Sequence, residues 1–180
     1  WGIILNLFIM LTPIVRLTTV LILSLYTSLS GCQNDVYDRA SANTTENVYD
    51  FSNFDGLDLS HAISVNVVQS DTYKVVVSCN DKYLDDLRVT QNNSTLKIKM
   101  AGWKSYRNLD LKAEIHLPAL KTLQMSGASR IVLNNLKGRN MSIDVSGASS
   151  LKGQIDLSNT LEIYASVASR IQLEGVVNNA

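Results

Sequence analysis

The sequence predicts an all-β fold arranged as a β-solenoid, a coil of short strands and turns. The phrases MSGASRI, VSGASSL and ASVASRI begin at residues 125, 145 and 165, so one pattern recurs every 20 residues. Val, Ile, Leu, Ser, Thr and Asn are abundant and aromatic residues make up only 7% of the chain, which favours strands and tight turns. A repeat this short does not suit pairs of helices, so we expect coils of about 20 residues.

Residues 1–31 are predicted to be a lipoprotein signal peptide that precedes this fold. The stretch VRLTTVLILSLYTSLSGC has one positive charge, an apolar run and then small residues before a cysteine. Its last four residues, LSGC, resemble a lipobox, which in bacterial lipoproteins marks cleavage before the cysteine and lipidation of its thiol. We therefore expect a lipid at Cys32. A membrane-spanning helix is the alternative, but Pro13 and Arg16 interrupt the apolar stretch.

Trp1 and Met10 bear on where this segment starts, and Gln33 bears on where the protein is sent. The chain opens with Trp1, and Met10 would make a better signal start, so the residues before it could be upstream translation or a fragment boundary. Gln33 follows the cysteine, where aspartate resembles an inner-membrane retention signal in Gram-negative lipoproteins. We therefore expect a cell-envelope protein anchored to the outer membrane, on either its periplasmic or its surface side. Residues 32–48 are polar without periodicity and are predicted to form a flexible tether.

The folded domain is predicted to occupy residues 49–180 and to begin with an opening strand or cap. The turn sequences QSDT and QNNS separate the next apolar runs. Strands are expected at residues 62–69, 73–79, 87–91, 94–100 and 109–118. The segment NDKYLDDL is predicted to form one helical turn with Asn80 or Asp81 as its cap. The strand that follows places Lys112, Glu114 and His116 on one face, which predicts a solvated surface for His116.

The 20-residue repeat is predicted to stack like residues on like residues. Leu123, Ile143 and Ile163 align, and so do Ile131, Leu151 and Ile171. Each SGAS phrase must turn a corner, where glycine permits a tight backbone and serine can bond unpaired backbone groups. The predicted corner residues are Ser126, Gly127, Ser129, Ser146, Gly147, Ser149, Ser166 and Ser169. Val167 replaces glycine in the third block, so that corner is expected to need a less unusual φ.

Charge and composition argue against several functions. Positive and negative side chains balance at 16 each without a basic face, so a nucleic-acid partner is not expected. Lipidation of Cys32 would leave Cys79 alone, which excludes an internal disulfide and predicts a buried strand position for Cys79. Asp144 aligns with Gln124 and Tyr164, so no pair of acids arises for hydrolysis. No metal-ligand spacing is present, and we expect neither a cofactor nor catalysis.

Two groups of side chains are candidate ligand contacts. Arg130 and Arg170 align with a serine between them and could contact an anionic glycan, although a solvated solenoid edge is the plainer interpretation. The phrase GWKSYRN gathers aromatic and cationic side chains in a predicted turn, a combination that suits stacking on a sugar or pairing with an anion. Its candidates are Trp103, Lys104, Tyr106 and Arg107. The alternative is that Trp103 or Tyr106 folds back over the core.

Several phrases together resemble the head GIN domain family of auto-transporter adhesins. They are GLDLSHAISVNVVQSDTYKVVV, TLKIKM, LPALKTLQMSGASRI and IDVSGASSLKGQI, and the resemblance covers about residues 50–180. It implies a lipobox-bearing or secreted envelope protein with a right-handed β-solenoid. Members of the family usually continue through further coils and a closing strand, whereas this chain stops at EGVVNNA, so we expect truncation at its C-terminus.

Three functions remain open from the sequence. The first is a lipid-anchored, non-catalytic envelope adhesin or binding module for a glycan or a protein. The second is an envelope scaffold or assembly module that pairs with another chain through its solenoid ends or edge strands. The third is a carbohydrate-active enzyme. The ligand and the oligomeric state cannot be read from the residues.

Overall fold

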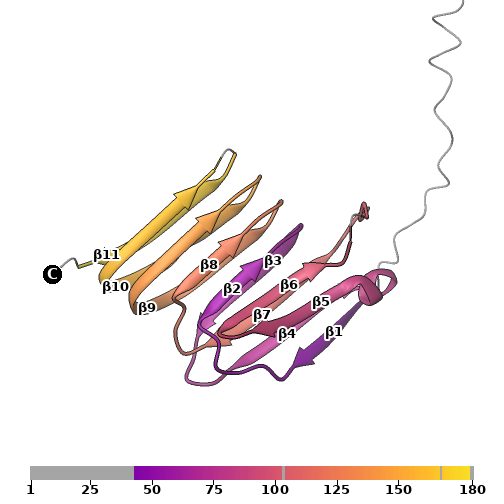
Figure 1. Ribbon diagram of the computed structural model, residues 1–180, viewed down its shortest axis with the longest axis horizontal. Helices are drawn as coiled ribbons and strands as arrows, with labels where there is room; N and C mark the ends of the chain where they lie inside the picture. The colour runs from indigo at the N-terminus through magenta and orange to yellow at the C-terminus, as the bar shows by residue number, and fades with distance from the viewer. Residues whose placement is uncertain (1–42, 103, 167, 179–180) are drawn as a thin grey trace, which may run out of the picture. The chain divides into compact units, whose positions relative to one another are not determined.

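The computed structural model describes residues 43–102, 104–166 and 168–178, and in them eleven strands form one sheet (Figure 1). The predicted all-β class is confirmed. The strands are β1 (Thr44–Tyr49), β2 (Gly56–Leu59), β3 (Ile63–Gln69), β4 (Lys74–Asn80), β5 (Leu87–Asn92), β6 (Thr95–Met100), β7 (Leu111–Leu117), β8 (Thr122–Met125), β9 (Arg130–Val145), β10 (Ser150–Ala165) and β11 (Arg170–Val177). The five strands predicted between residues 62 and 118 correspond to β3–β7, with ends that differ by one or two residues.

The sheet curls because β9 takes part in both of its halves. Residues 130–134 of β9 pair with β3, whereas residues 142–145 pair with β8. One half therefore runs in the order β1-β4-β7-β3-β9, and the other runs β9-β8-β2-β6-β5. The two halves share one hydrophobic core. Its largest fully buried side chains are Phe54, Leu57, Leu59, Ile63, Leu96, Ile98, Met100, Leu111, Ile115, Leu117, Leu123 and Met125.

The repeat fixes the register of the parallel strands β8–β11, which lie side by side in Figure 1. Ile143 pairs with both Leu123 and Ile163, as their alignment in the sequence predicts. Leu151 likewise pairs with Ile131 and Ile171. These inward positions build columns of aliphatic side chains along the stack.

An earlier segment of the chain supplies a further copy of this unit, which the 20-residue period does not reveal. Strands β2 and β3 lie between later strands: β2 pairs with β6 and β8, and β3 pairs with β7 and β9. The backbone N–H of Ser126 donates to the carbonyl of Leu59 at 2.9 Å, which places the two corners in register. His61 stands where the repeats have glycine, and its φ is +74°.

The helical turn predicted near residue 81 is present, and Asn80 stands at its N-cap position as predicted. A 3₁₀ helix, η1, spans Asp81–Asp86, and the Asn80 side chain makes no capping hydrogen bond. The Asn80 Oδ1 atom instead accepts a hydrogen bond of 2.6 Å from the backbone N–H of Asp110. The amide is used to hold the start of β7, so it is not available to the helix.

The predicted tether must be shortened, because residues 44–48 belong to β1. This strand pairs antiparallel with β4 from Thr44 to Tyr49. As an edge strand with half-buried and exposed positions, β1 needs little apolar character, so its sequence gave no strand signal. The predicted signal peptide, the lipid site at Cys32 and residues 32–42 of the tether lie outside the described residues. Within the described residues, no helix has the length and apolar character that crossing a membrane requires.

Cys79 lies inside the core, as its place in an alternating run predicts. Its side chain is 0% exposed in β4. Burial raises the pKa of the Cys79 thiol, which disfavours the reactive thiolate. Cys79 is therefore a packing residue in the folded protein.

Candidate ligand-binding groove

A groove of about 620 Å³ lies on the outer face of the half-sheet formed by β1, β4, β7, β3 and β9. Alternation along each strand produces it, because every second side chain enters the core and the others line the outside. The lining residues are Glu46, Val48, Ser64, Val65, Asn66, Lys74, Val76, Ser78, Lys112, Ala113, Glu114, Arg130 and Val132. Val48 is 73% exposed and Val132 is 39% exposed, so the groove offers apolar surface beside charged groups.

The acid in the middle of the groove is already neutralised by neighbours. Glu114 Oε1 lies 2.8 Å from His116 Nε2 and 3.0 Å from Lys74 Nζ. These hydrogen bonds, first that of His116 and then that of Lys74, hold the pKa of Glu114 below its usual value. Lys112 makes a separate exposed ion pair with Asp110 at 2.8 Å. Glu114 therefore has little capacity to attract a cationic ligand.

Arg130 differs from these groups because it has no ion-pair partner among the described residues. It opens β9, and its exposed side chain belongs to the wall of the groove. Ser150 pairs with Arg130 on one side and with Arg170 on the other. The two arginines therefore occupy one line across three neighbouring strands, in the alignment that the sequence predicts.

In the loop that follows β6, Tyr106 packs against the protein. Its ring meets the Tyr83 ring edge-on at 5.2 Å and the His61 ring at 6.2 Å. Its hydroxyl donates to the backbone carbonyl of Ala101. Desolvation by these neighbours raises the pKa of Tyr106. This is the alternative in which an aromatic side chain of the loop folds back over the core.

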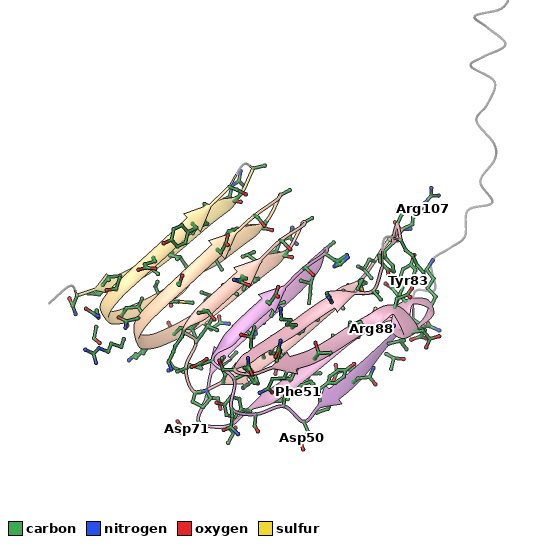
Figure 2. The ribbon with its side chains drawn as sticks, viewed as in Figure 1. Asp50, Phe51, Asp71, Tyr83, Arg88 and Arg107 are labelled. Atoms are coloured by element: carbon green, nitrogen blue, oxygen red, sulfur yellow. The ribbon has the colours of Figure 1, made fainter. Side chains whose placement is uncertain are left out.

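The cations of this loop lie at its outer side. Lys104 Nζ contacts the two carboxylate oxygens of Asp86 at 2.9 and 3.1 Å, and this contact raises the pKa of Lys104. The backbone carbonyl of Arg107 accepts a hydrogen bond of 2.9 Å from the Tyr83 hydroxyl. Figure 2 shows Arg107 beyond Tyr83 at one end of the strands. Trp103 lies outside the described residues.

Serine hydroxyls bind backbone carbonyls inside the corners of the repeat. Ser129 Oγ lies 2.7 Å from the carbonyl oxygens of both Ser126 and His61, so its proton can be donated to either. Ser149 Oγ donates to the carbonyl of Ser146 at 2.8 Å. Further corner contacts are Ser146 Oγ to the Met125 carbonyl at 3.2 Å, Ser169 Oγ to the carbonyls of Val145 and Gly147 at 3.2 and 3.3 Å, and the Ser166 N–H to the Val145 carbonyl at 2.9 Å.

Each of the three corners contains a residue with positive φ. Gly127 and Gly147 have φ values of +81° and +70°. In the third corner, which was expected to need a less unusual φ, Ala168 has φ +69°. Val167 itself lies outside the described residues. The third corner therefore keeps a left-handed residue, because the chain must still reverse over the same short distance.

The described residues hold no cluster of three or more His, Cys, Asp or Glu side chains suited to a metal ion. Asp144 pairs with Gln124 and with Tyr164, as their alignment predicts, so no second acid faces it across the strands. The arrangement on the outer face can bind a ligand by charge, hydrogen bonds and apolar contact.

A curled all-β sheet with a groove on its outer surface is the class of domain that the fold defines, and the family comparison places the chain more narrowly. Residues 53–180 match the family described as "Putative auto-transporter adhesin, head GIN domain". The chain belongs to this family. The comparison with curated proteins gave no match.

Solved structures share the fold at low sequence identity. A "putative adhesin" from Parabacteroides merdae has a TM-score of 0.66 and 14% identity, over 74% of this chain and 57% of that one. A "putative lipid binding protein" from Parabacteroides distasonis has a TM-score of 0.56 and 18% identity, over 77% and 69% of the two chains. A "putative adhesin" from Bacteroides fragilis has a TM-score of 0.55 and 14% identity, over 78% and 99%. The chain thus spans 57% of the length of the Parabacteroides merdae structure.

Proposed function

We propose that this chain is a lipid-anchored cell-envelope protein that binds a glycan or protein ligand without catalysis, as an adhesin or a related binding module. The observation that carries the proposal is the groove on the outer face of β1, β4, β7, β3 and β9, with Arg130 in its wall. The groove combines apolar side chains with a cation that has no acidic partner. Covering such a surface with a ligand gives a favourable free energy of binding. Membership of the adhesin family supports the same class.

The fold that presents this groove is proposed to be a right-handed β-solenoid. Parallel pairings advance by 20 residues from Ile131 to Leu151 and from Leu151 to Ile171. The same step joins Leu123 to Ile143 on the other half of the sheet. A step of 20 residues at these positions, and of 19 where Leu136 pairs with Ile155, is the geometry of coils stacked one upon another.

The lipid anchor is proposed at Cys32, after cleavage of the signal peptide that the LSGC sequence predicts. It would hold the domain at the outer membrane, on its periplasmic or surface side. Mass spectrometry of the protein from a bacterial membrane fraction tests the anchor. A diacylglycerol on Cys32 is expected, and an unmodified thiol there would contradict it.

A glycan-array and matrix-protein screen of the full chain tests the binding function. Saturable binding is expected, and Val132→Glu in the groove should weaken it. Gln124→Glu adds the same charge to an exposed position on the opposite half-sheet and should leave binding unchanged. Loss of binding on Trp103→Ala would instead locate the contact in the loop after β6. Folded protein that binds nothing would contradict the proposal.

Assembly through an edge strand is the second candidate function, favoured by one observation. Strand β1 lies at one end of the strand order, and its Val48 is 73% exposed. Such a strand can pair with a strand of another chain. Cross-linking through Asn47→Cys, with sizes compared by gel electrophoresis, would reveal edge-to-edge dimers. A monomer at all concentrations would exclude edge-to-edge pairing between copies of this chain.

A further inference from the structure

A line of alternating serines and cations crosses five neighbouring strands on the outer face. Lys112 on β7 pairs with Ser64 on β3, and Ser64 pairs with Arg130 on β9. Arg130 then pairs with Ser150 on β10, which pairs with Arg170 on β11. We call these five residues the cation row. The three cations are exposed and the two serines are half-buried.

The sheet fixes the distance between the charges of the cation row. Neighbouring strands lie about 4.8 Å apart, so cations on every second strand are separated by about 9–10 Å. This spacing is a property of the backbone ladder and is therefore rigid. It comes close to the length of two sugar rings in an extended polysaccharide.

The surroundings of the cation row leave its positive charge uncompensated near Arg130 and Arg170. Neither arginine has an acidic partner among the described residues. The adjacent row on the same face contributes Asn66, Val132, Lys152 and Gln172. Beside the two arginines it therefore adds one further cation, Lys152, and no acid. Glu114 lies further along that row and is bound to Lys74 and His116, and Glu174 lies four residues beyond Arg170 on β11. Lys112 is paired with Asp110, but both side chains are well exposed, at 62% and 44%, so the pair is weak.

Acids of the same stack are found on the opposite half of the sheet. Asp144 and Glu162 are exposed on the second halves of β9 and β10, which pair in register there. The outer face around Arg130 and Arg170 therefore carries mainly cations, whereas the second halves of β9 and β10 carry acids. An anionic chain would be attracted to Arg130 and Arg170 and repelled by Asp144 and Glu162.

We propose that the cation row binds a linear acidic polysaccharide with a carboxylate on every second sugar, laid across the strands. This inference rests on the proposed binding function and names its ligand class. Arginine suits the role because its planar guanidinium donates two parallel hydrogen bonds to a carboxylate. Ser64 and Ser150 lie between the cations, where they can bond the hydroxyls of the intervening neutral sugars. A nucleic acid fits less well, because its phosphates follow one another at less than the spacing of the cations.

Binding of the full chain to immobilised hyaluronan, a polymer with one uronate in each disaccharide, tests the proposal. Arg130→Ser and Arg170→Ser should each lower the affinity about tenfold, and the double variant should lower it about a hundredfold. Arg139→Ser is the matched control, because Arg139 is an exposed arginine of β9 outside the cation row. Its affinity should stay within about twofold of the parent. Circular dichroism and thermal unfolding check that each variant folds.

A second variant separates spacing from charge. Combining Arg130→Ser with Ser150→Arg keeps the net charge and places two arginines on adjacent strands, β10 and β11. Affinity for hyaluronan should fall, and preference should move toward polygalacturonate, which has a carboxylate on every sugar. Equal binding of both polymers by parent and variant would overturn the proposal, since it would mean that net charge alone governs binding.

Two further outcomes distinguish this proposal from the function on which it rests. Hyaluronan whose carboxylates have been reduced to alcohols should not bind, and unchanged binding of this polymer would contradict the role of the arginines. If the broad screen finds a ligand that the Arg130 and Arg170 variants still bind, while hyaluronan does not bind, the binding function stands and the cation row is not its site. If no ligand binds in either experiment, both proposals fail.

Discussion

The N-terminal region, β1–β7, and the repeat region, β8–β11, build the same curled sheet by different means. In the N-terminal region, antiparallel strands β1, β4 and β5 flank parallel ones, and aromatic pairs such as Phe54 with Tyr73 fill the space between them. The repeat region pairs only in parallel, and its one aromatic residue, Tyr164, is 61% exposed. Aliphatic columns replace aromatic packing there.

The difference shows that residues at the same position of the repeat can contribute differently to stability. Leu123 and Ile143 are 0% exposed, whereas Ile163 in the next repeat is 42% exposed. Register sets where a side chain points, but the neighbours on both sides decide how much apolar surface it buries.

The largest effect is expected from truncating the buried member of this column. Ile143→Ala should lower the free energy of unfolding by about 2–5 kcal/mol, because it leaves a cavity in close-packed surroundings. Ile163→Ala removes the same atoms from a partly exposed site and should cost about 1 kcal/mol or less. Urea denaturation of both variants measures the difference. Equal losses would mean that the two repeats are equally covered in solution.

The next largest loss of stability is expected from substituting a corner glycine. Gly147 has φ +70°, and a Cβ atom there would lie 2.4 Å from the carbonyl oxygen of Gly127 in the neighbouring corner. Gly147→Ala should therefore destabilise by about 2–3 kcal/mol through strain and contact together. Gly102, in the N-terminal region, has φ +75° with no atom within 4 Å of such a Cβ. Gly102→Ala isolates the strain alone, about 1 kcal/mol, and thermal unfolding should rank the two variants in this order.

Loss of one corner hydroxyl should have an intermediate effect. Ser149 is 1% exposed and donates to the Ser146 carbonyl, so Ser149→Ala leaves that oxygen without this donor. A loss of about 1–2 kcal/mol is expected. Ser158→Ala, at an exposed position of β10, is the matched control and should change stability little. A neutral Ser149→Ala variant would show that water replaces the hydroxyl.

The smallest effect is expected at the ion pair that joins the two regions. Asp55 Oδ2 lies 2.7 Å from Lys121 Nζ, and this hydrogen bond lowers the pKa of Asp55 from its ordinary value of 3.8. A lowered folded-state pKa adds stability that is present above pH 3.8 and is lost as the pH falls through the folded value. The pair lies in contact with solvent, which screens it, so its contribution to the free energy of unfolding is small.

Asp55→Asn should therefore reduce stability at neutral pH and make no difference at the lowest pH at which the protein stays folded. Asp71→Asn, at an exposed turn position, controls for the loss of a negative charge. Unfolding curves measured from pH 7 down to pH 3 check this. A deficit of Asp55→Asn that persists unchanged at low pH would assign the effect to something other than the ion pair.

Much of this architecture can be predicted from local patterns. Alternation assigned the inward and outward faces of β7, and the repeat assigned the register of Leu123, Ile143 and Ile163, because both depend only on nearby residues. The role of β2 and β3 could not be predicted in this way. Residues 70–121 separate these strands from the corner that they join, so a 20-residue period does not include them. The match of LDLSHA with LQMSGA is the one local sign that they belong to the repeat.

In the candidate site, too, local patterns predict some features and not others. Arg130 and Arg170 could be aligned from the repeat. Lys112 was predicted on an outer face, but nothing local says which strand lies beside which, so the cation row could not be assembled. Tyr106 illustrates another limit, because the aromatic partners that draw its ring inward, His61 and Tyr83, come from distant segments.

The position of β2 and β3 between later strands has a consequence for how the chain folds. These two strands leave the ribosome early, yet one edge of each stays without its partner until β8 and β9 have been made. The N-terminal region cannot finish folding first and then serve as a platform for the repeats. Non-local pairing of this kind slows folding, because a long loop must close, at a cost in entropy, before the stabilising contacts can form. A chain whose centre must wait for β8 and β9 stays unfolded for longer after synthesis than one that adds its coils in order.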